Sequence, residues 1–584
     1  MLPRIWFRRV ALICFSLLAL GLLGAIYPWG SIELGSLDGV LLAKAAPDEC
    51  FVEIGDQRPI NEDGSCDEGI PKVNQSYVWG LTKTRGRLWG GSGPNILCLI
   101  GGTLLGTGTP SQNDSWVCEY GDGPFIPPAS EGTGDWRPGT IFAYDVVANR
   151  YVDHTPDDPK ILDTVGMRAA GSNSDFVYVG GPSLSGGINL FAFSAISGTY
   201  LGSKHFPEFL NIRKWLDHEG VLYTTVGNAT GGGSVLRFDP DRESPNFPFD
   251  YTVVGNLNGD GSELAVHEGR LFASTWPNLA GTGGGFPPPG AIWMSAPIPE
   301  GGLTADHANP ASGAEQWQLV FSYAQYDPDL ITVIATGMGA LASFDGYLFF
   351  GPMHVPTIGL VAHQLAADTF GYEIDPTETL LNSSRAIAIF RGKDFGTTEQ
   401  QVELVYGSEE LPAFNPFKPN EGWKLTPNSM GMAPLSGQSG FGNIFNNYTW
   451  GMQVYRGELY VATMDWSFVA SEVLASGGGG FPAPPVPIDP DNFGADLWRF
   501  PSADEPAILE SQTGFGNFLN YGGRVLLADD AYLYIGSANA MNLRAGADGE
   551  FKGGWELLKF LPRGEKPARV HAQHAPLRSG TERH

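Results

Sequence analysis

The stretches RGELYVATMDW, residues 456–466, and DDAYLYIGSAN, residues 529–539, decide the fold. Each begins with a tight turn, continues as a short apolar strand and ends in small or polar residues. When the chain is aligned on the apolar residue of the second strand, this hairpin pattern occurs seven times. The aligned anchor residues are Leu88, Val177, Leu222, Leu271, Leu348, Leu459 and Leu533. A short module that recurs at intervals predicts a repeat architecture.

Further strands follow most of these hairpins. GSVLRFD, from residue 233, is typical of the third strand, and QVELVYG, from residue 401, of the fourth. Four-stranded modules of this kind bury both faces of each sheet only by stacking radially into a closed ring. The sequence therefore predicts an all-β fold, a seven-bladed β-propeller of four-stranded antiparallel blades over residues 76–562. Six or eight blades are the alternatives, because the long interval between Leu348 and Leu459 has room for one more blade.

The composition agrees with an all-β chain. The 79 glycines, 44 prolines and 17% charged residues supply many tight turns, and the 42% apolar residues can fill a core. Apolar residues at helical spacing are almost absent, which argues against a helical or α/β fold.

The N-terminal sequence predicts a targeting segment. Arg4, Arg8 and Arg9 precede an uncharged run over residues 10–27, and AKAA at 43–46 is a small-residue cleavage site. We expect residues 1–45 to be a signal peptide and the protein to be extracellular or periplasmic. An uncleaved N-terminal anchor is the alternative, and the only expected contact with a membrane.

The two ends of the mature chain receive separate predictions. The last hairpin module has only three strands, so we expect ECFVEIG, residues 49–55, to add the missing outer strand. Residues 46–75 would then be an N-terminal segment that closes the propeller. Residues 563–584 are polar and basic without periodicity, which predicts a disordered tail.

Four cysteines remain after residue 45, in two close pairs. In an oxidising compartment we expect disulfides between Cys50 and Cys66 and between Cys98 and Cys118. The net charge of −28 makes nucleic acid a poor partner.

The hairpins resemble kelch-type repeats, in which the second strand ends in a glycine pair. RLWGG at 87–91 and FVYVGG at 176–181 carry that feature, and the other five modules have different residues there. The resemblance implies a kelch-like secreted propeller, a group that contains ligand-binding proteins and a copper-radical oxidase. The oxidase needs a cysteine cross-linked to a tyrosine, whereas the cysteines here are better used as disulfides. We expect no such copper chemistry.

One rim of the propeller is the predicted ligand site. Loops after the second strands emerge there, and long aromatic loops on a rigid scaffold often bind ligands. The candidate residues combine rings for stacking with amide, imidazole and carboxylate groups for hydrogen bonding, which suits a sugar or a peptide. They are Trp276, Asn278, His354, Asp465, Trp466, Asn539 and Asn542. The alternative is that they cap the blades and satisfy turn backbone.

A second set of candidates lies nine residues before the anchors. Arg168, Arg213 and Arg524 share this position with two tryptophans, a serine and a glycine. Three arginines at one repeat position can ring a channel mouth and bind an anion. The alternative is that each arginine pairs with a neighbouring acid.

No cofactor or metal site is predicted. GNLNGDGSE, residues 255–263, resembles a calcium loop only weakly, because it lacks the acid at the twelfth position. We expect an exported propeller that binds a carbohydrate or an extracellular protein without catalysis of its own. The alternative is a polysaccharide-active enzyme, a lyase or hydrolase, with Asp465 or His354 as acid or base and the arginines holding a uronate or sulfate.

Overall fold

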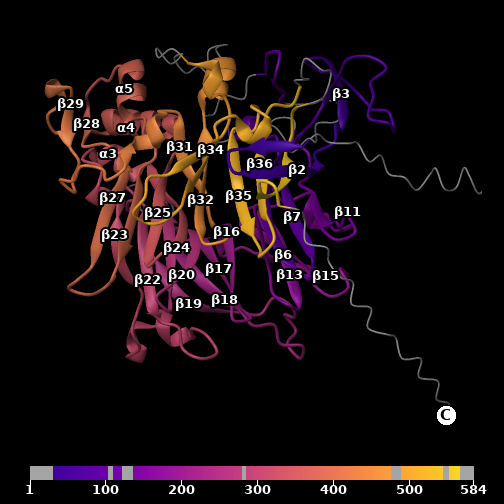
Figure 1. The fold of residues 1–584 in the computed structure, drawn as a ribbon, viewed down its shortest axis with the longest axis horizontal. Coiled ribbons are helices and arrows are strands. Elements are labelled where there is room, and N and C mark those ends of the chain that lie inside the picture. Colours follow the sequence, from indigo (N-terminus) through magenta and orange to yellow (C-terminus); the bar gives the residue numbers. More distant parts are fainter. Residues whose placement is uncertain are drawn as a thin grey trace, which may run out of the picture.

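The computed structural model describes residues 31–100, 102, 110–120, 136–278, 285–474, 488–543 and 552–565. The apolar run 10–27, with its three arginines, lies outside the described residues, as does the tail from residue 566. Long strands make up the body of the molecule, and most helices and small sheets gather at one end of them (Figure 1).

Consecutive hairpins extend into antiparallel sheets. Three of these are separate four-stranded sheets. The first consists of β12(Ala169–Ser172), β13(Phe176–Pro182), β14(Ile188–Ser194) and β15(Tyr200–Phe206), and the second of β16(Phe209–His218), β17(Val221–Asn228), β18(Gly233–Phe238) and β19(Tyr251–Leu257). The third consists of β20(Asp260–His267), β21(Arg270–Trp276), β22(Ala291–Pro297) and β23(Gln318–Ser322).

The other long strands pair in the same way. They form four further groups. The first contains β6(Gln75–Thr84), β7(Arg87–Pro94), β10(Ile141–Asp145) and β11(Arg150–Asp153), and the second β24(Thr336–Phe344), β25(Tyr347–His354), β26(Ile389–Lys393) and β27(Gln401–Gly407). The third contains β31(Asn446–Tyr455), β32(Glu458–Asp465), β33(Leu497–Phe500) and β34(Ile508–Ser511), and the fourth β35(Gly522–Ala528), β36(Leu533–Ala538), β37(Glu556–Pro562) and β2(Leu37–Lys44). Single pairs such as Met353–Tyr448 and Met464–Gly522 link these groups into one sheet.

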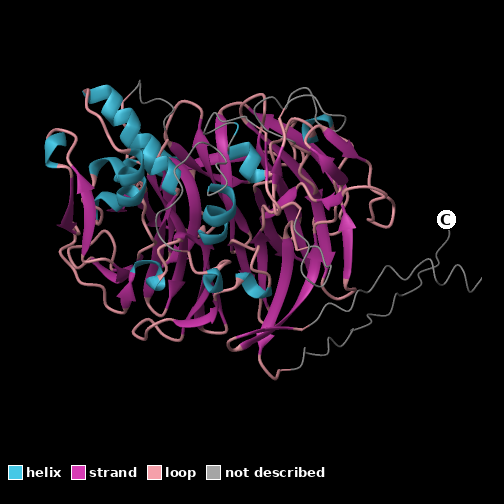
Figure 2. Ribbon diagram, turned by 90° about the horizontal axis from the view of Figure 1, so that it is seen from above, coloured by secondary structure: helices cyan, strands magenta, loops and turns pink. Residues whose placement is uncertain are grey.

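The first strands of these groups contact one another in cyclic order. β6 contacts β12, and the contacts continue through β16, β20, β24, β31 and β35 back to β6. Viewed from above, strands dominate the molecule and helices are few (Figure 2). The chain is therefore a mostly-β protein of the β-propeller type.

The seven predicted anchors occupy equivalent places. Each lies at the first or second position of a second strand, and none is more than 1% exposed. Five of them face an aromatic residue of the third strand, as Leu88 faces Tyr144 and Leu459 faces Phe500. The sequence alignment is confirmed at these positions.

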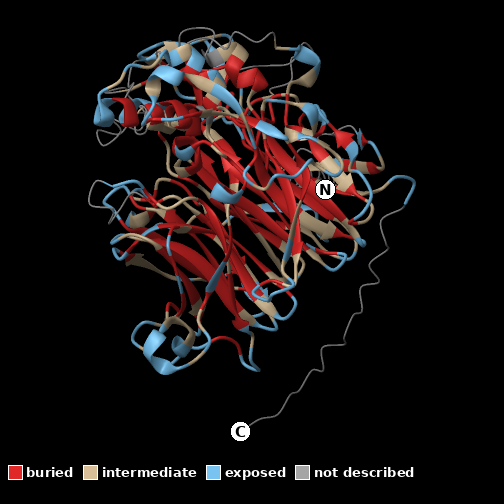
Figure 3. Ribbon diagram, turned by 90° about the vertical axis from the view of Figure 1, so that its left-hand side faces the viewer, coloured by how far each residue is buried: buried red, intermediate tan, exposed pale blue. Residues whose placement is uncertain are grey.

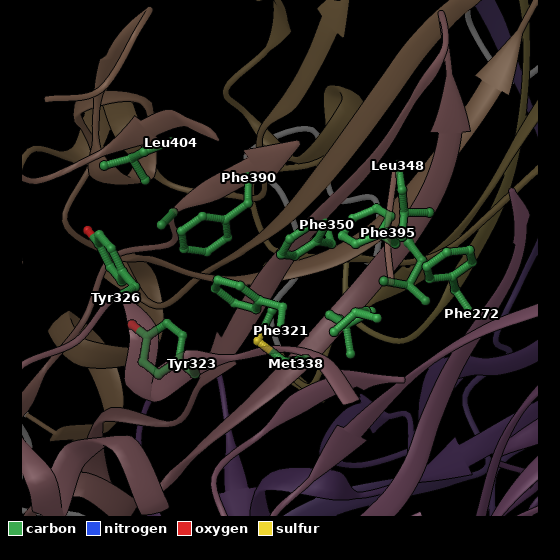
Figure 4. Close-up of a cluster of buried hydrophobic side chains, with 14 of the residues drawn as sticks. Phe272, Phe321, Tyr323, Tyr326, Met338, Leu348, Phe350, Phe390, Phe395 and Leu404 are labelled. Carbon is green, nitrogen blue, oxygen red and sulfur yellow. The ribbon is translucent and has the colours of Figure 1, made fainter. Parts of the chain in front are cut away.

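Neighbouring sheets hold together through apolar side chains packed between them. In one such core, Phe272 of β21 and Phe321 of β23 meet Phe350 of β25 and Phe390 of β26 (Figure 4). Phe321 lies 5.0 Å from Phe350 and 5.1 Å from Phe390 between ring centroids. Buried residues follow the strands throughout, and exposed residues gather at the turns (Figure 3). Each sheet thus stabilises the next one.

The helices and small sheets are insertions between the long strands. Three helices follow second strands directly: α2(Ile96–Leu99), α4(Pro356–Phe370) and α6(Ser467–Val469). The others are α3(Leu330–Ile334), α5(Pro376–Ser383), a π-helix η9(Ala470–Leu474), and the 3-10 helices η3(Pro159–Ile161), η4(Ala305–Ala308), η5(Pro310–Ser312), η6(Tyr323–Gln325), η7(Pro419–Glu421), η8(Ser439–Gly442), η11(Pro490–Asn492) and η12(Gly514–Gly516). The short strands are β28(Glu410–Phe414) with β29(Trp423–Pro427), β8(Ser111–Gln112) with β9(Val117–Cys118), β1(Ile32–Leu34) against β2, and β30(Gly437–Gln438) against β27.

The longest interval between two anchors contains several such insertions. This interval, between Leu348 and Leu459, holds α4, α5 and the β28–β29 hairpin. Within the described part of the chain, no helix has the length and hydropathy needed to cross a bilayer.

The closing strand differs from the prediction. β2, at residues 37–44, pairs with β37 as the outer strand of the last sheet. Residues 49–53 form β3(Glu49–Glu53) instead, between β4(Asp56–Arg58) and β5(Ile70–Lys72), in a small separate sheet. Gly39 fits this pairing, because a Cβ there would lie 2.3 Å from the Phe560 ring of β37. Residues 32–44, which fall within the expected signal segment 1–45, thus form strands of the described fold, and the closing strand lies before the expected closing segment 46–75.

Both predicted disulfides are present. Cys50 of β3 is bonded to Cys66, and Cys98 of α2 is bonded to Cys118 of β9. On the chain-entropy model each is worth about 3 kcal/mol. Buried Lys72 also ties the small sheet down, because it pairs with Glu49 at 2.7 Å and with Glu119 at 3.0 Å.

We predict that a chain beginning at residue 46 is less stable than one beginning at residue 31. The shorter chain loses β2 and the burial of Leu34 and Leu37, each worth roughly 1.5–3 kcal/mol, and it exposes the edge of β37. Urea unfolding of the two chains measures the difference. Equal unfolding midpoints would contradict closure by β2.

Candidate functional site

A ring of side chains lies nine residues before the anchors, in the first strands. Six of its seven residues sit at a β-bulge, where the register of the first two strands shifts; for Trp79 the shift falls between Val78 and Gly80. The other bulged positions are Arg213, Ser262, Gly339, Trp450 and Arg524. Arg168 directly precedes β12. A bulge leaves one residue unpaired and redirects its side chain, so the repeat itself builds this ring.

The three arginines of the ring line one cavity of about 540 Å³, a size typical of small-molecule sites. Each guanidinium lies over an indole: Arg168 is 5.6 Å from the centre of Trp79, Arg213 is 4.9 Å from that of Trp276, and Arg524 is 5.8 Å from that of Trp450. Cation–π contact of this kind holds a guanidinium by its face and leaves its edge free to donate hydrogen bonds.

These arginines are poorly neutralised. Arg168 donates to Asn211 Oδ1 at 2.8 Å and Arg213 approaches Met353 Sδ at 3.5 Å, while the Nε of each is buried without a partner. Within the described residues none of the three forms an ion pair, contrary to the alternative that each pairs with an acid. Burial and the charge of Arg213 lower the pKa of Arg524 to about 9. A buried cluster of like charges favours the binding of an anion.

Two acids act on this cluster. Against the lowering effect of burial, Asp260 raises the pKa of Arg168, and Glu263 raises the pKa values of Arg213 and Arg524. Burial raises the pKa of Asp260 to about 6, and the charges of Arg168 and Arg213 oppose that rise. Glu263 interacts with Lys214 of β16 at 3.6 Å. Among the described residues that line the arginine cavity, there is no Asp or Glu.

Three tyrosines complete the cavity wall. The hydroxyls of Tyr77 and Tyr521 hydrogen-bond to each other. Tyr448 packs edge-on against Trp276 at 6.0 Å and Trp450 at 5.4 Å, and its hydroxyl has no hydrogen-bond partner in the described structure. Burial raises the pKa of the Tyr448 phenol, and the charges of Arg213, Arg168 and Arg524 oppose that rise. Its hydroxyl is therefore electrostatically coupled to the whole arginine cluster.

A second chamber of about 640 Å³ lies against the same ring. Trp79, Arg213, Trp450 and Arg524 line both spaces, whereas the second chamber also includes Glu263 and further first-strand residues. The ring is thus a shared wall between two parts of the channel.

The candidate rim residues fall into two groups. Trp276 and Trp466 line the arginine cavity with the three arginines. Asn278, His354, Asp465, Asn539 and Asn542 do not line it, and each is 5% exposed or less.

The asparagines of the second group hold loops together. Asn278 donates to Gly232 O at 2.9 Å, and Asn539 donates to Lys552 O at 2.7 Å. Asn542 bonds both backbone groups of Val117, accepting from its N–H at 3.0 Å and donating to its carbonyl at 3.1 Å. These contacts support the alternative that such residues satisfy backbone groups.

His354 lies in a buried polar cluster. Its Nδ1 is 3.0 Å from Thr336 Oγ1, and its Nε2 is buried without a partner. Burial, together with the charge of nearby Arg385, lowers the pKa of His354 to about 3. The imidazole is therefore neutral and removed from the arginine cavity.

Asp465 serves as a backbone brace at the end of β32. It accepts from the Ser467 N–H at 2.8 Å and from Asn443 Nδ2 at 2.7 Å. Burial raises the pKa of Asp465 to about 7, and neighbouring Asp496 adds to the rise. The carboxyl is fully buried and does not line the arginine cavity.

The tyrosines and the ring tryptophans were not among the candidates drawn from the sequence. Tyr77 and Tyr448 lie two residues before Trp79 and Trp450, and Asn211 and Asp260 hold the same position in their strands. Continuing the count from each anchor by two residues along a strand, where side chains on one face alternate, would have found Tyr77 and Tyr448 but not Tyr521, which lies three residues before Arg524.

The weak calcium loop does not assemble a cation site. Asn256 Nδ2 donates to Ala308 O at 2.7 Å, while Asp260 interacts with the arginine cluster. In the described ranges, no group of three His, Cys, Asp or Glu side chains is arranged to hold a metal.

No family model matches this chain, and neither does any curated protein. Solved structures similar to it include the β-propeller domain of the Trilobed protease from Pyrococcus furiosus, at 8% identity and a TM-score of 0.32, covering 84% of this chain and 94% of that one. A post-proline cleaving enzyme from Rickettsia typhi matches at 7% identity and a TM-score of 0.34, covering 87% of this chain and 57% of that one. A puromycin hydrolase matches at 8% identity and a TM-score of 0.36, covering 80% of this chain and 50% of that one.

These comparisons correct the expectation of a propeller that binds without catalysis. The similar structures include hydrolases, and the alternative of an enzyme fits them better. At these TM-scores the likeness carries no argument about which reaction this chain performs. The choice of reaction depends on the site itself.

We predict that Asp465 makes the stability of the fold depend on pH. Because its folded pKa is raised above the unfolded value, its contribution is full below about pH 4 and is lost as the pH rises through about 7. Asp465→Asn should therefore flatten the decline in melting temperature between pH 5 and pH 8. Identical declines in the two proteins would show that Asp465 does not carry this effect.

Proposed function

We propose that this chain is a polysaccharide lyase that cleaves uronate-containing glycans in the arginine cavity. The observation that carries the proposal is that three guanidiniums share one aromatic cavity, two of them with a buried Nε that has no partner, and no carboxylate is among the described residues lining it. A uronate supplies the missing negative charge, and its ring supplies a face that packs on aromatic side chains.

The absence of lining carboxylates favours elimination over hydrolysis. Glycoside hydrolysis uses two carboxyl groups, one on each side of the scissile bond. Elimination from a uronate needs positive charge at its carboxylate and a group that moves a proton. The described lining residues supply the positive charge and a proton-transfer group that elimination needs, and they include none of the carboxyl groups that hydrolysis needs.

The reaction follows from this arrangement. Guanidiniums on the substrate carboxylate stabilise the negative charge that develops when the proton on C5 leaves. The electron pair of that C–H bond forms the C4=C5 double bond, the C4–O bond breaks, and the leaving oxygen takes up a proton. The products are a new chain end and an unsaturated uronate.

Tyr448 is the residue we assign to proton transfer. In its phenolate form it takes the C5 proton, and the resulting phenol donates a proton to the leaving oxygen. Burial raises the pKa of Tyr448 on balance, and the charges of the three arginines offset part of that rise. Asp465 and His354, the acid–base candidates from the sequence, are replaced in this role because neither lines the cavity.

The finer architecture is part of the same proposal. The cyclic order of first strands supports seven blades, each of four antiparallel strands, with β2 as the last outer strand. The glycine pairs support a kelch-like relationship, because a Cβ on Gly91 would lie 2.2 Å from Met167 and one on Gly181 2.0 Å from Gly166. The two disulfides support export to an oxidising compartment.

We predict that purified protein cleaves a uronate-containing polysaccharide and that Arg213→Gln loses about ten- to a hundredfold in kcat/KM, the worth of a hydrogen bond to a charged group. Ultraviolet absorbance of the unsaturated product measures elimination. Arg237→Gln is the matched control, because Arg237 lies on third strand β18 and pairs with Asp239 at 2.7 Å. Equal loss in both variants, or new reducing ends without the unsaturated product, would contradict the proposal.

We also predict a shift in the pH dependence of kcat. Removing a guanidinium in Arg524→Gln lets the pKa of Tyr448 rise further, so the increase of kcat with pH should move to higher pH. Tyr448→Phe should lose activity across the whole pH range while binding uronate oligosaccharides normally. An unshifted profile for Arg524→Gln, or an active Tyr448→Phe, would remove Tyr448 from the mechanism.

A further inference from the structure

A separate cavity of about 660 Å³ adjoins the arginine cavity. It lies between α5, the β28 strand and the segment around η8, and Trp466 and Thr357 line both cavities. Trp466 and Thr357 are therefore a wall common to both cavities, and one chain molecule would have to pass Trp466 to occupy both.

The electrostatics of the second cavity are opposite to those of the first. Arg385 is its basic lining residue in the described structure, and Asp327 neutralises it at 2.7 Å. Glu409 and Glu410 also line the cavity and are exposed, and neither makes an ion pair within the described residues. Like charges repel at short range, so this cavity disfavours an anionic sugar.

The lining is suited to a neutral sugar. The Ser408 and Ser439 hydroxyls lie 2.8 Å apart, and Asn447, 1% exposed, has a buried Oδ1 without a partner. Leu381 and Ile444 add exposed apolar surface. Hydroxyl groups on one edge of a sugar and C–H groups on its face match this combination.

We infer that this second cavity binds a neutral sugar unit next to the uronate, so that the substrate alternates acidic and neutral sugars. The inference rests on the proposed lyase function and names its substrate class. A polymer made only of uronates would place a carboxylate beside Glu409 and Glu410.

The test compares oligosaccharides of equal length. Hyaluronan and unsulfated chondroitin oligosaccharides alternate a uronate with an N-acetylhexosamine, and oligogalacturonates contain only uronates. We expect the alternating chains to bind at least tenfold more tightly by calorimetry and to be cleaved with a higher kcat/KM. Tighter binding of oligogalacturonates, or no binding of any of these probes, would overturn the inference.

Two variants locate the discrimination. The double variant Glu409→Lys with Glu410→Lys should reduce the preference at least tenfold by improving oligogalacturonate binding, and Ile444→Trp should weaken only the alternating chains by filling the cavity. Glu300→Lys, in the loop after β22, is the control for charge.

The outcomes separate the two proposals. If Arg213→Gln weakens every probe while these cavity variants leave the preference unchanged, the lyase function stands and the second cavity is not a subsite. If Arg213→Gln leaves binding and cleavage unchanged, the lyase function fails and the inference fails with it.

Discussion

The structure depends on covering the apolar faces of its sheets. Each sheet presents large side chains on both faces, and only neighbouring sheets on both sides remove them from water. The cyclic order of the first strands achieves this, and the pairing of β2 with β37 joins the two ends of the described chain. The N-terminal strand is therefore as important to the fold as any of the repeated hairpins.

The same packing offsets the free-energy cost of burying charges in the channel. First strands converge on the channel, and the residue at the equivalent point of each repeat lies at a β-bulge in six cases of seven, Arg168 being the exception. Three of these side chains are arginines held over indoles, away from water and without ion pairs in the described structure. Burying charge in this way costs stability, and such costs are typical of sites that bind or react. An anionic substrate offsets the cost when it binds.

The sequence predicted the repeated parts of the molecule well. The anchors, both disulfides and the shared position of Arg168, Arg213 and Arg524 follow from strand periodicity and local spacing, and these are short-range signals. The closing strand was missed because LDGVLLAK, residues 37–44, overlaps the small-residue motif at 43–46 that also fits a cleavage site. Its partner β37 lies more than 500 residues away, and no local pattern identifies such a partner.

The candidate site was predicted only in part for a related reason. A polar residue after a strand serves equally well as a ligand contact or as a backbone brace, and burial decides between them. Asn542 and Asp465 are braces, whereas Trp276 and Trp466 reach the cavity. Helix α4 was also missed, although Pro356 at its first turn and the following Leu, Ala and Gln residues favour a helix, because the surrounding strand repeats dominated the pattern.

The most direct measurement is a crystal structure of the Tyr448→Phe protein with a uronate-containing oligosaccharide. The account predicts one sugar carboxylate within hydrogen-bonding distance of at least two of the guanidiniums of Arg168, Arg213 and Arg524, with C5 of that sugar facing residue 448. An oligosaccharide bound elsewhere, with the arginine cavity holding only water, would contradict it.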